Sequence, residues 1–371
     1  MVNLTIVCES KGDNLGDLAI YRGLNALLDT EKTLNIRPLQ LSFEKKRKDV
    51  SRSNEDLKYL HFYSDFYKRI PVLHMLFLML RLLAYNFGRL SKIRKLIEDS
   101  DFVIFGGGSL LINNKLVFPL NLLFISCICR LKNVKYAVAG VSTRHVESTL
   151  ARCLLRTFLK NSEFIYVRDE NSIDLCLKQF GVEALYCPDF ALCQKLSQTR
   201  EIKYSFAINV MGRQTHGMFS NEIVVDTYKD KIKKVIEQCS YSNIALFTTG
   251  EESDYLIARQ IIDEMCDESQ NRVEIIHPET YEQLFSVYEK TNIIFATRLH
   301  SALIGISQGK TLCCFNWDSK VEGAFKSLGY EHSLVSLDDD FYFKINHARK
   351  LEKPNLSTFD GFKNRLNDYV R

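Results

Sequence analysis

The chain has 371 residues, corresponding to roughly two domains, and 46% of them are apolar and 25% charged. This composition is ordinary for globular proteins and excludes a disordered or fibrous chain. The net charge of only +4 excludes a nucleic-acid binder that works by bulk positive charge.

Short runs rich in Val, Ile and Phe alternate with segments of helical period, which predicts βαβ units on parallel sheets. In the first half, strands are predicted at 2–8, 101–105, 135–140, 164–167 and 184–186, and helices at 17–29, 55–69, 72–98, 116–131, 147–160 and 170–180. A polar stretch at 194–203 predicts a linker. Beyond it, strands are predicted at 204–210, 243–248, 273–276, 292–296 and 311–315, and helices at 222–239, 251–268, 280–289, 299–308 and 320–328.

The expected fold class is therefore α/β, with two Rossmann-like, doubly wound domains. We place the first domain at 1–195 and the second at 196–345, followed by a closing helix within 346–371. Ligands of such sheets bind beyond the carboxyl ends of the strands, where helix N-termini favour anions.

Cysteines and apolar stretches bear on compartment and membrane contact. The eleven cysteines include no C-x-x-C pair, which predicts reduced, buried thiols, no metal site and a cytoplasmic protein without a signal peptide. The apolar stretches 70–85 and 116–128 fall short of the ~20 uninterrupted apolar residues that span a bilayer, so both are expected to be buried helices. For 70–90, flanked by basic residues, the alternative is a helix on the inner face of the cytoplasmic membrane.

Several loops that follow predicted strands of the first domain are built for close approach of a ligand. The loop Gly12–Asp17 combines two glycines with helix-capping carboxylate and amide side chains. Three glycines at 106–108 precede Ser109, either because a ligand approaches the backbone or because a neighbouring loop crowds it. Further polar groups at strand ends are Ser142, Arg144, His145, Arg168 and Asp189. For Arg168, the alternative to a ligand contact is a salt bridge with Asp169 or Glu170.

The second domain carries the strongest pattern, Arg298-Leu299-His300-Ser301, at a strand-to-helix junction. A guanidinium, an imidazole and a positive helix end at one spot predict an anion site. The segments Gly212-Arg213 and Thr248-Thr249-Gly250-Glu251 are expected to line the same rim.

Taken in order, the segments GDNLGD, DFVIFGGGSLL, YVRDENS, YCPDFAL and TRLHSALIGISQGK resemble the polysaccharide pyruvyl transferase family from about residue 12 to residue 330. The resemblance implies two Rossmann-like domains facing across a cleft, as in GT-B glycosyltransferases. It further implies transfer of pyruvate from phosphoenolpyruvate, without a cofactor, to a sugar of a cell-surface polysaccharide or its lipid-linked precursor. The product is a cyclic ketal, and phosphate is released.

In this family the Arg-Leu-His motif, matching Arg298-Leu299-His300, is associated with holding phosphoenolpyruvate, and Arg168 matches a further donor contact. We predict that His300 holds the phosphate or acts as the acid, and that Asp17 or Asp189 is the base toward an acceptor hydroxyl. The predicted catalytic set is thus Asp17, Asp189, Arg298 and His300. The predicted binding set is Gly12, Asn14, Gly16, Gly107, Gly108, Ser109, Arg168, Arg213, Gly250, Glu251, Arg298, Leu299, His300 and Ser301.

The first domain is expected to hold the acceptor and the second the donor. Two other functions fit the same residues. A glycosyltransferase would use the cleft and His300 for a nucleotide sugar, and a non-catalytic docking module would keep the fold alone.

Overall fold

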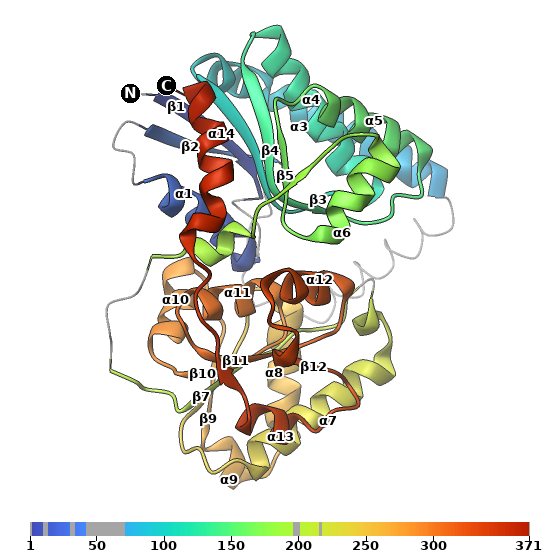
Figure 1. Cartoon of the computed structure of the whole chain (residues 1–371). Coiled ribbons are helices and arrows are strands. Elements are labelled where there is room, and N and C mark those ends of the chain that lie inside the picture. Colours follow the sequence, from blue (N-terminus) through green and yellow to red (C-terminus); the bar gives the residue numbers. More distant parts are fainter. Residues whose placement is uncertain are drawn as a thin grey trace.

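The computed structural model describes residues 2–9, 14–29, 34–41, 71–195, 201–214 and 217–370. These residues form two α/β units, drawn one above the other in Figure 1. The helix expected at 55–69 and the predicted site residue Gly12 lie outside the described residues.

The first unit is built on a six-stranded parallel sheet in the order β2-β1-β3-β4-β5-β6. Its strands are β1 (Val2–Cys8), β2 (Leu34–Gln40), β3 (Phe102–Leu111), β4 (Lys135–Thr143), β5 (Ile165–Val167) and β6 (Leu185–Tyr186). Its helices are α1 (Leu15–Leu28), α3 (Pro71–Glu98), α4 (Val117–Leu131), α5 (Thr149–Lys160) and α6 (Glu170–Leu175), the last continuing into a π-helical turn at Cys176–Phe180. One core holds α3, α4 and α5 against one face of the sheet, and α1 packs on the other.

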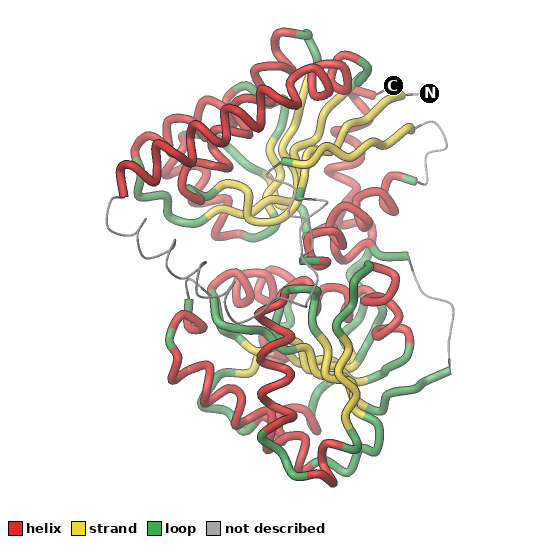
Figure 2. Tube along the Cα trace, turned by 180° about the vertical axis from the view of Figure 1, so that it is seen from behind, coloured by secondary structure: helices red, strands yellow, loops and turns green. Residues whose placement is uncertain are grey.

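The second unit has a sheet in the order β12-β11-β10-β7-β8-β9, with β13 antiparallel to β11. Figure 2 shows the strands of each unit among its helices. Its strands are β7 (Phe206–Asn209), β8 (Ile244–Phe247), β9 (Val273–Ile276), β10 (Ile293–Ala296), β11 (Thr311–Phe315), β12 (Leu334–Val335) and β13 (Arg349–Lys350). Its helices are α7 (Glu222–Gln238), α8 (Glu252–Asp263), α9 (Asp267–Gln270), α10 (Tyr281–Glu289), α11 (Leu299–Ser307), α12 (Ser319–Leu328) and α13 (Phe341–Asn346).

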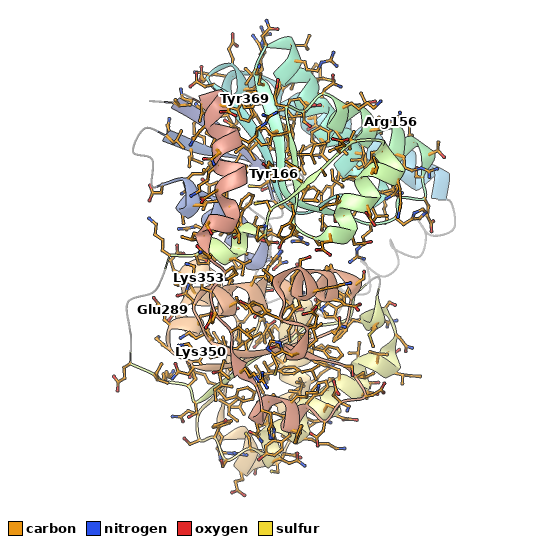
Figure 3. All side chains as sticks on the ribbon, in the orientation of Figure 1. Arg156, Tyr166, Glu289, Lys350, Lys353 and Tyr369 are labelled. Carbon is orange, nitrogen blue, oxygen red and sulfur yellow. The ribbon has the colours of Figure 1, made fainter. Side chains whose placement is uncertain are left out.

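The closing helix α14 (Asp360–Val370) returns to the first unit and runs beside its sheet (Figure 1). Phe362 of α14 lies 5.8 Å, between ring centroids, from Tyr166 of β5. The ring centroids of Tyr369 in α14 and Phe102 in β3 lie 5.3 Å apart. Tyr166 and Tyr369 are labelled in Figure 3. The last helix of the chain therefore completes the core of the first unit.

The strand β2 is not among the predicted elements, because it contains Pro38, a residue that is unfavourable within a sheet. The structure places β2 at the edge of the sheet, paired only with β1. An edge strand tolerates proline because one side of its backbone has no partner strand.

Two predicted strand ends are also wrong. The strand predicted at 101–105 continues through the three glycines to Leu111, and the one predicted at 135–140 continues to Thr143. Gly107 has a φ of +86°, and a Cβ there would lie 2.3 Å from Cγ2 of Ile20. The glycines thus keep the strand paired while α1 packs directly on it.

The described part of the chain contains no helix that is long and apolar enough to cross a membrane. The predicted helix at 116–131 is confirmed as α4, with Leu122 and Ile125 fully buried. Residues 71–90 of the segment 70–90 belong to α3, in which Phe87 is exposed. Contact of this segment with a membrane surface stays a prediction.

Candidate active site

A cavity of about 220 Å³ lies between the two units, where loops after strands of both sheets meet. Its walls combine glycines, cations and carboxylates from distant parts of the sequence. They consist of Cys8, Glu9, Asn14, Asp17, Ile20, Gly106, Gly107, Gly108, Ser109, Leu110, Phe118, Arg168, Arg298, Leu299, His300, Trp317 and Lys320.

His300, in the first turn of α11, reaches from the second unit to ionisable groups of the first. Its Nε2 lies 3.3 Å from Nη1 of Arg168, and its Nδ1 lies 3.4 Å from Oδ1 of Asp17. The approach requires a glycine at position 16, where a Cβ would stand 2.8 Å from Cβ of His300. Burial lowers the pKa of His300 to about 3, with the cation of Arg168 adding to the effect. The imidazole is therefore neutral at pH 7.

Asp17, in the first turn of α1, carries the opposite shift. Burial and the neighbouring Glu9 carboxylate raise the pKa of Asp17 to about 7. Its side chain remains 33% exposed, so the carboxyl group is accessible from the cavity. Asp17 is therefore about half protonated at neutral pH, and it is the group of the cavity best suited to move a proton.

Arg168 forms a buried ion pair with Asp189, with 2.5 Å between Nη1 and Oδ2. Its Nη2 donates to the Ser109 hydroxyl at 3.3 Å. The alternative pairing with Asp169 is wrong, because Asp169 instead caps α6 by accepting from Ser172 N. Asp189 also caps the 3₁₀ turn Phe190–Cys193, so its carboxylate holds Arg168 and the backbone together.

Arg298 forms a bidentate ion pair with Asp254 of α8, a residue outside the predicted site. Nε and Nη2 of Arg298 lie 2.5 and 2.8 Å from the two carboxylate oxygens. Asp254 is fully buried and also accepts from Gly212 N at 2.8 Å. The bidentate pair fixes the guanidinium at the cavity wall. Among the described residues, Nη1 of Arg298 has no hydrogen-bond or ion-pair partner and can therefore donate to a ligand.

The backbone contributes to the site through helix N-termini. The first residues of α1, α11 and α12 all supply cavity-lining side chains. At α11 the N-cap residue is Arg298, whose side chain makes no capping hydrogen bond to the helix. Its first amide N–H groups, together with the positive end of the helix dipole, favour an anion in the cavity.

Trp317, in the loop after β11, and Lys320, in the first turn of α12, are also absent from the predicted set. The Lys320 ammonium stands 4.4 Å from the centroid of the Trp317 ring. Burial lowers the pKa of Lys320 to about 8. The sequence contains a signal that could have predicted these two site residues, because Trp317 and Lys320 follow a strand and precede a helix, as the Arg298 motif does.

Comparison with known protein families matches residues 14–319 to the polysaccharide pyruvyl transferases. The chain belongs to this family. No curated protein sequence gives a significant match.

Solved structures with the same architecture include S. aureus MnaA in complex with UDP, with a TM-score of 0.56 at 10% identity, covering 100% of this chain and 97% of that one. A UDP-GlcNAc 2-epimerase from Methanocaldococcus jannaschii gives a TM-score of 0.55 at 10% identity, with 99% of both chains covered. At such identities the similarity concerns the fold alone. It confirms the expected GT-B-like arrangement of two parallel α/β sheets for this pyruvyl transferase family member.

Some predicted binding residues do not line the cavity. Ser301 is buried behind it and accepts from the Tyr288 hydroxyl. The Arg213 side chain is 60% exposed and lies 3.8 Å from Glu222. Gly250 and Glu251 are outside the lining, although Glu251 adds to the raised pKa of Asp17. Within the described residues, no group of three or more His, Cys, Asp or Glu is arranged to hold a metal ion.

Proposed function

We propose that this protein transfers pyruvate from phosphoenolpyruvate to two hydroxyl groups of a sugar in a cell-surface polysaccharide or its lipid-linked precursor. The observation that carries the proposal is the cavity itself. It joins the Arg298-Leu299-His300 motif to Arg168 of the other unit and to a carboxyl group that holds a proton near pH 7. This combination suits a small donor with two anionic groups and a reaction that needs an acid.

Phosphoenolpyruvate presents a carboxylate and a phosphate. Nη1 of Arg298 and the first amides of α11 offer donors to one anionic group, and Arg168 with Ser109 offers donors on the opposite wall. His300 stands between the two walls. As a neutral imidazole it donates a single hydrogen bond and adds no charge of its own.

The reaction then needs one proton donor and one leaving group. Asp17 gives its proton to the terminal carbon of the enol, which becomes a methyl group. One sugar oxygen bonds to the central carbon, the bond from that carbon to the phosphate oxygen breaks with its electron pair on phosphate, and the second sugar oxygen takes the vacated position. Of the two hydroxyl protons, one restores Asp17 and the other leaves with phosphate, so the balance closes without a cofactor.

The test is to titrate the protein calorimetrically with phosphoenolpyruvate and with a panel of UDP-sugars, and to follow phosphate release with sugar acceptors. We expect phosphoenolpyruvate to bind, and a product heavier by one pyruvyl ketal to appear by mass spectrometry. His300→Ala should leave the protein folded and at least ~100-fold less active. Binding of a UDP-sugar without binding of phosphoenolpyruvate would overturn the proposal in favour of a glycosyltransferase.

A further inference from the structure

The two faces of the first sheet are covered by helices that differ in charge. Helices α3, α4 and α5 pack on one face, and α1 and α14 pack on the other (Figure 1). In α14 the charges balance, with Asp360 and Asp368 against Lys363 and Arg365. Helices α4 and α5, in contrast, contain basic residues and no acidic residue within their bounds. Exposure to solvent alone does not explain such a difference between two faces of one sheet.

Helix α5 carries three cations, Arg152, Arg156 and Lys160, of which Arg156 is labelled in Figure 3. The negative end of the helix dipole explains Lys160, which lies in the last turn. Arg152 lies near the positive end of the helix, where a cation is unfavourable. None of the three forms an ion pair with a described residue. Arg152 and Arg156 therefore add positive charge to the surface without stabilising their own helix.

The neighbouring helices extend this basic face. The only acidic residue of α3 is Glu98, which lies 2.9 Å from the ammonium group of Lys132 and is neutralised by it. Helix α4 adds Arg130 in its last turn. Between positions 84 and 98, the basic residues of α3 are Arg89, Lys92, Arg94 and Lys95. The three helices thus form a strongly positive layer in a chain whose net charge is only +4.

Each of the three helices also exposes a large apolar side chain. Leu131 of α4 is 81% exposed and Phe87 of α3 is 79% exposed, the two highest values for large apolar side chains among the described residues. Leu150, at the start of α5, is half exposed. A single exposed apolar residue is ordinary on a protein surface. Apolar side chains set among cations are instead typical of a surface that binds to lipid headgroups.

We propose that the outer face of α3, α4 and α5 binds the surface of a bilayer that contains anionic phospholipids. The basic side chains contact the lipid phosphates, and Phe87, Leu131 and Leu150 enter the headgroup region. This face includes part of the segment 70–90 and extends the predicted membrane contact to two further helices. It also turns one wall of the cavity toward the bilayer, because Phe118, in the first turn of α4, lines that cavity.

The test is flotation of the protein with vesicles of phosphatidylcholine alone and with vesicles that also contain phosphatidylglycerol. We expect the protein to float only with the anionic vesicles. Roughly 0.5 M salt should release it, because the Debye length then falls to a few ångströms. Equal flotation with both kinds of vesicle would overturn the inference. So would a protein that floats with neither, which is the result expected if the face binds a nucleic acid or an acidic protein instead.

Two double charge reversals separate this face from the effect of net charge. Arg152→Glu with Arg156→Glu should lower the vesicle partition coefficient by at least ~10-fold. Lys363→Glu with Arg365→Glu, in α14, makes the same change in net charge on the opposite face of the sheet, and its partition coefficient should stay within a few-fold of the wild type. Circular dichroism checks that both variants are folded. Equal losses in the two variants would show that net charge alone governs binding and would overturn the inference.

A third comparison changes an apolar side chain and leaves the charge unaltered. Leu131→Gln should bind anionic vesicles roughly 3- to 10-fold more weakly, because less apolar surface enters the headgroup region. Ile223→Gln is the control, since Ile223 is 73% exposed in α7 of the second unit, and it should bind as the wild type does. Unchanged binding of Leu131→Gln would contradict insertion of this face. None of these measurements involves phosphoenolpyruvate, so membrane binding and pyruvyl transfer can fail independently.

Discussion

At the scale of single residues, the cavity shifts the pKa values of two neighbouring groups, Asp17 and His300, in opposite directions. Asp17 and His300 lie 3.4 Å apart, yet the pKa of Asp17 is raised to about 7 and that of His300 lowered to about 3. At neutral pH the carboxyl group is therefore the better proton donor of the two. Between the two roles considered for His300, this favours holding the phosphate over acting as the acid.

The first prediction concerns Asp17→Asn. Because only the protonated carboxyl gives up a proton, kcat/KM of the wild type should fall as pH rises through about 7. Asp17→Asn should be roughly 100-fold less active, and its profile should lack that fall. Asp29→Asn, at the exposed end of the same helix, serves as control and should behave as the wild type. Full activity of Asp17→Asn would remove this residue from the chemistry.

The same variant makes a separate prediction about stability. A carboxyl with a raised pKa in the folded state destabilises the protein as pH rises from about 4 to 7, and the penalty stays constant above 7. Asp17→Asn removes it, so at pH 8 the variant should be more stable by on the order of 1 kcal/mol after allowance for solvent screening. Thermal unfolding at pH 8 and pH 4 measures this, and the difference should vanish at the lower pH.

At the scale of elements, the cavity depends on how closely α1 approaches its neighbours. A Cβ at Gly23, in the middle of α1, would lie 1.7 Å from the Phe190 carbonyl oxygen. Leu15 N, at the start of the same helix, donates to the Thr249 carbonyl of the second unit at 2.8 Å. Helix α1, which carries Asp17, thus packs closely against the 3₁₀ turn after β6 and is hydrogen-bonded to the loop after β8.

The third prediction compares two helical glycines. Gly23→Ala forces the backbone of α1 and of the Phe190 turn apart, and should cost on the order of 1–3 kcal/mol of unfolding free energy. Gly88→Ala in α3 meets no atom within 4 Å and should stabilise by up to ~1 kcal/mol. Urea unfolding of both variants provides the measurement. Equal effects from the two substitutions would contradict the close packing of α1.

At the scale of the whole molecule, the chain returns from the second unit, and its C-terminal helix α14 packs in the core of the first unit. Phe362 of α14 is 1% exposed, and its ring centroid lies 5.1 Å from that of Phe190. Phe190 in turn belongs to the turn that Asp189 caps. Packing of α14 on Phe190 therefore helps to hold Asp189, and with it the Arg168–Asp189 ion pair, in position.

The fourth prediction is that Phe362→Ala costs about 3–5 kcal/mol, the usual loss for a buried phenylalanine. Phe343→Ala, whose side chain is 56% exposed, is the control and should change stability little. Chemical denaturation followed by circular dichroism tests both. A loss below 1 kcal/mol for Phe362→Ala would show that α14 does not support the first unit.

The sequence by itself determined the α/β class, most of the helices and strands, and the motif Arg298-Leu299-His300, because periodicity and strand-end position are local properties. It missed β2, where edge position overrides the signal of Pro38. The predicted ends of β3 and β4 were also too early, because glycines with positive φ were expected to end a strand. In the structure, the two strands remain paired with each other through these glycines.

Only the tertiary structure decided the chemical state of the site. Asp254 and Asp189 become partners of the two arginines through contacts between residues far apart in the chain. Likewise, the pKa values of Asp17 and His300 are shifted because both side chains are buried between the two units. The sequence around either residue does not show this burial. Charge and desolvation depend on distance in space, and that distance exists only once both sheets are packed together.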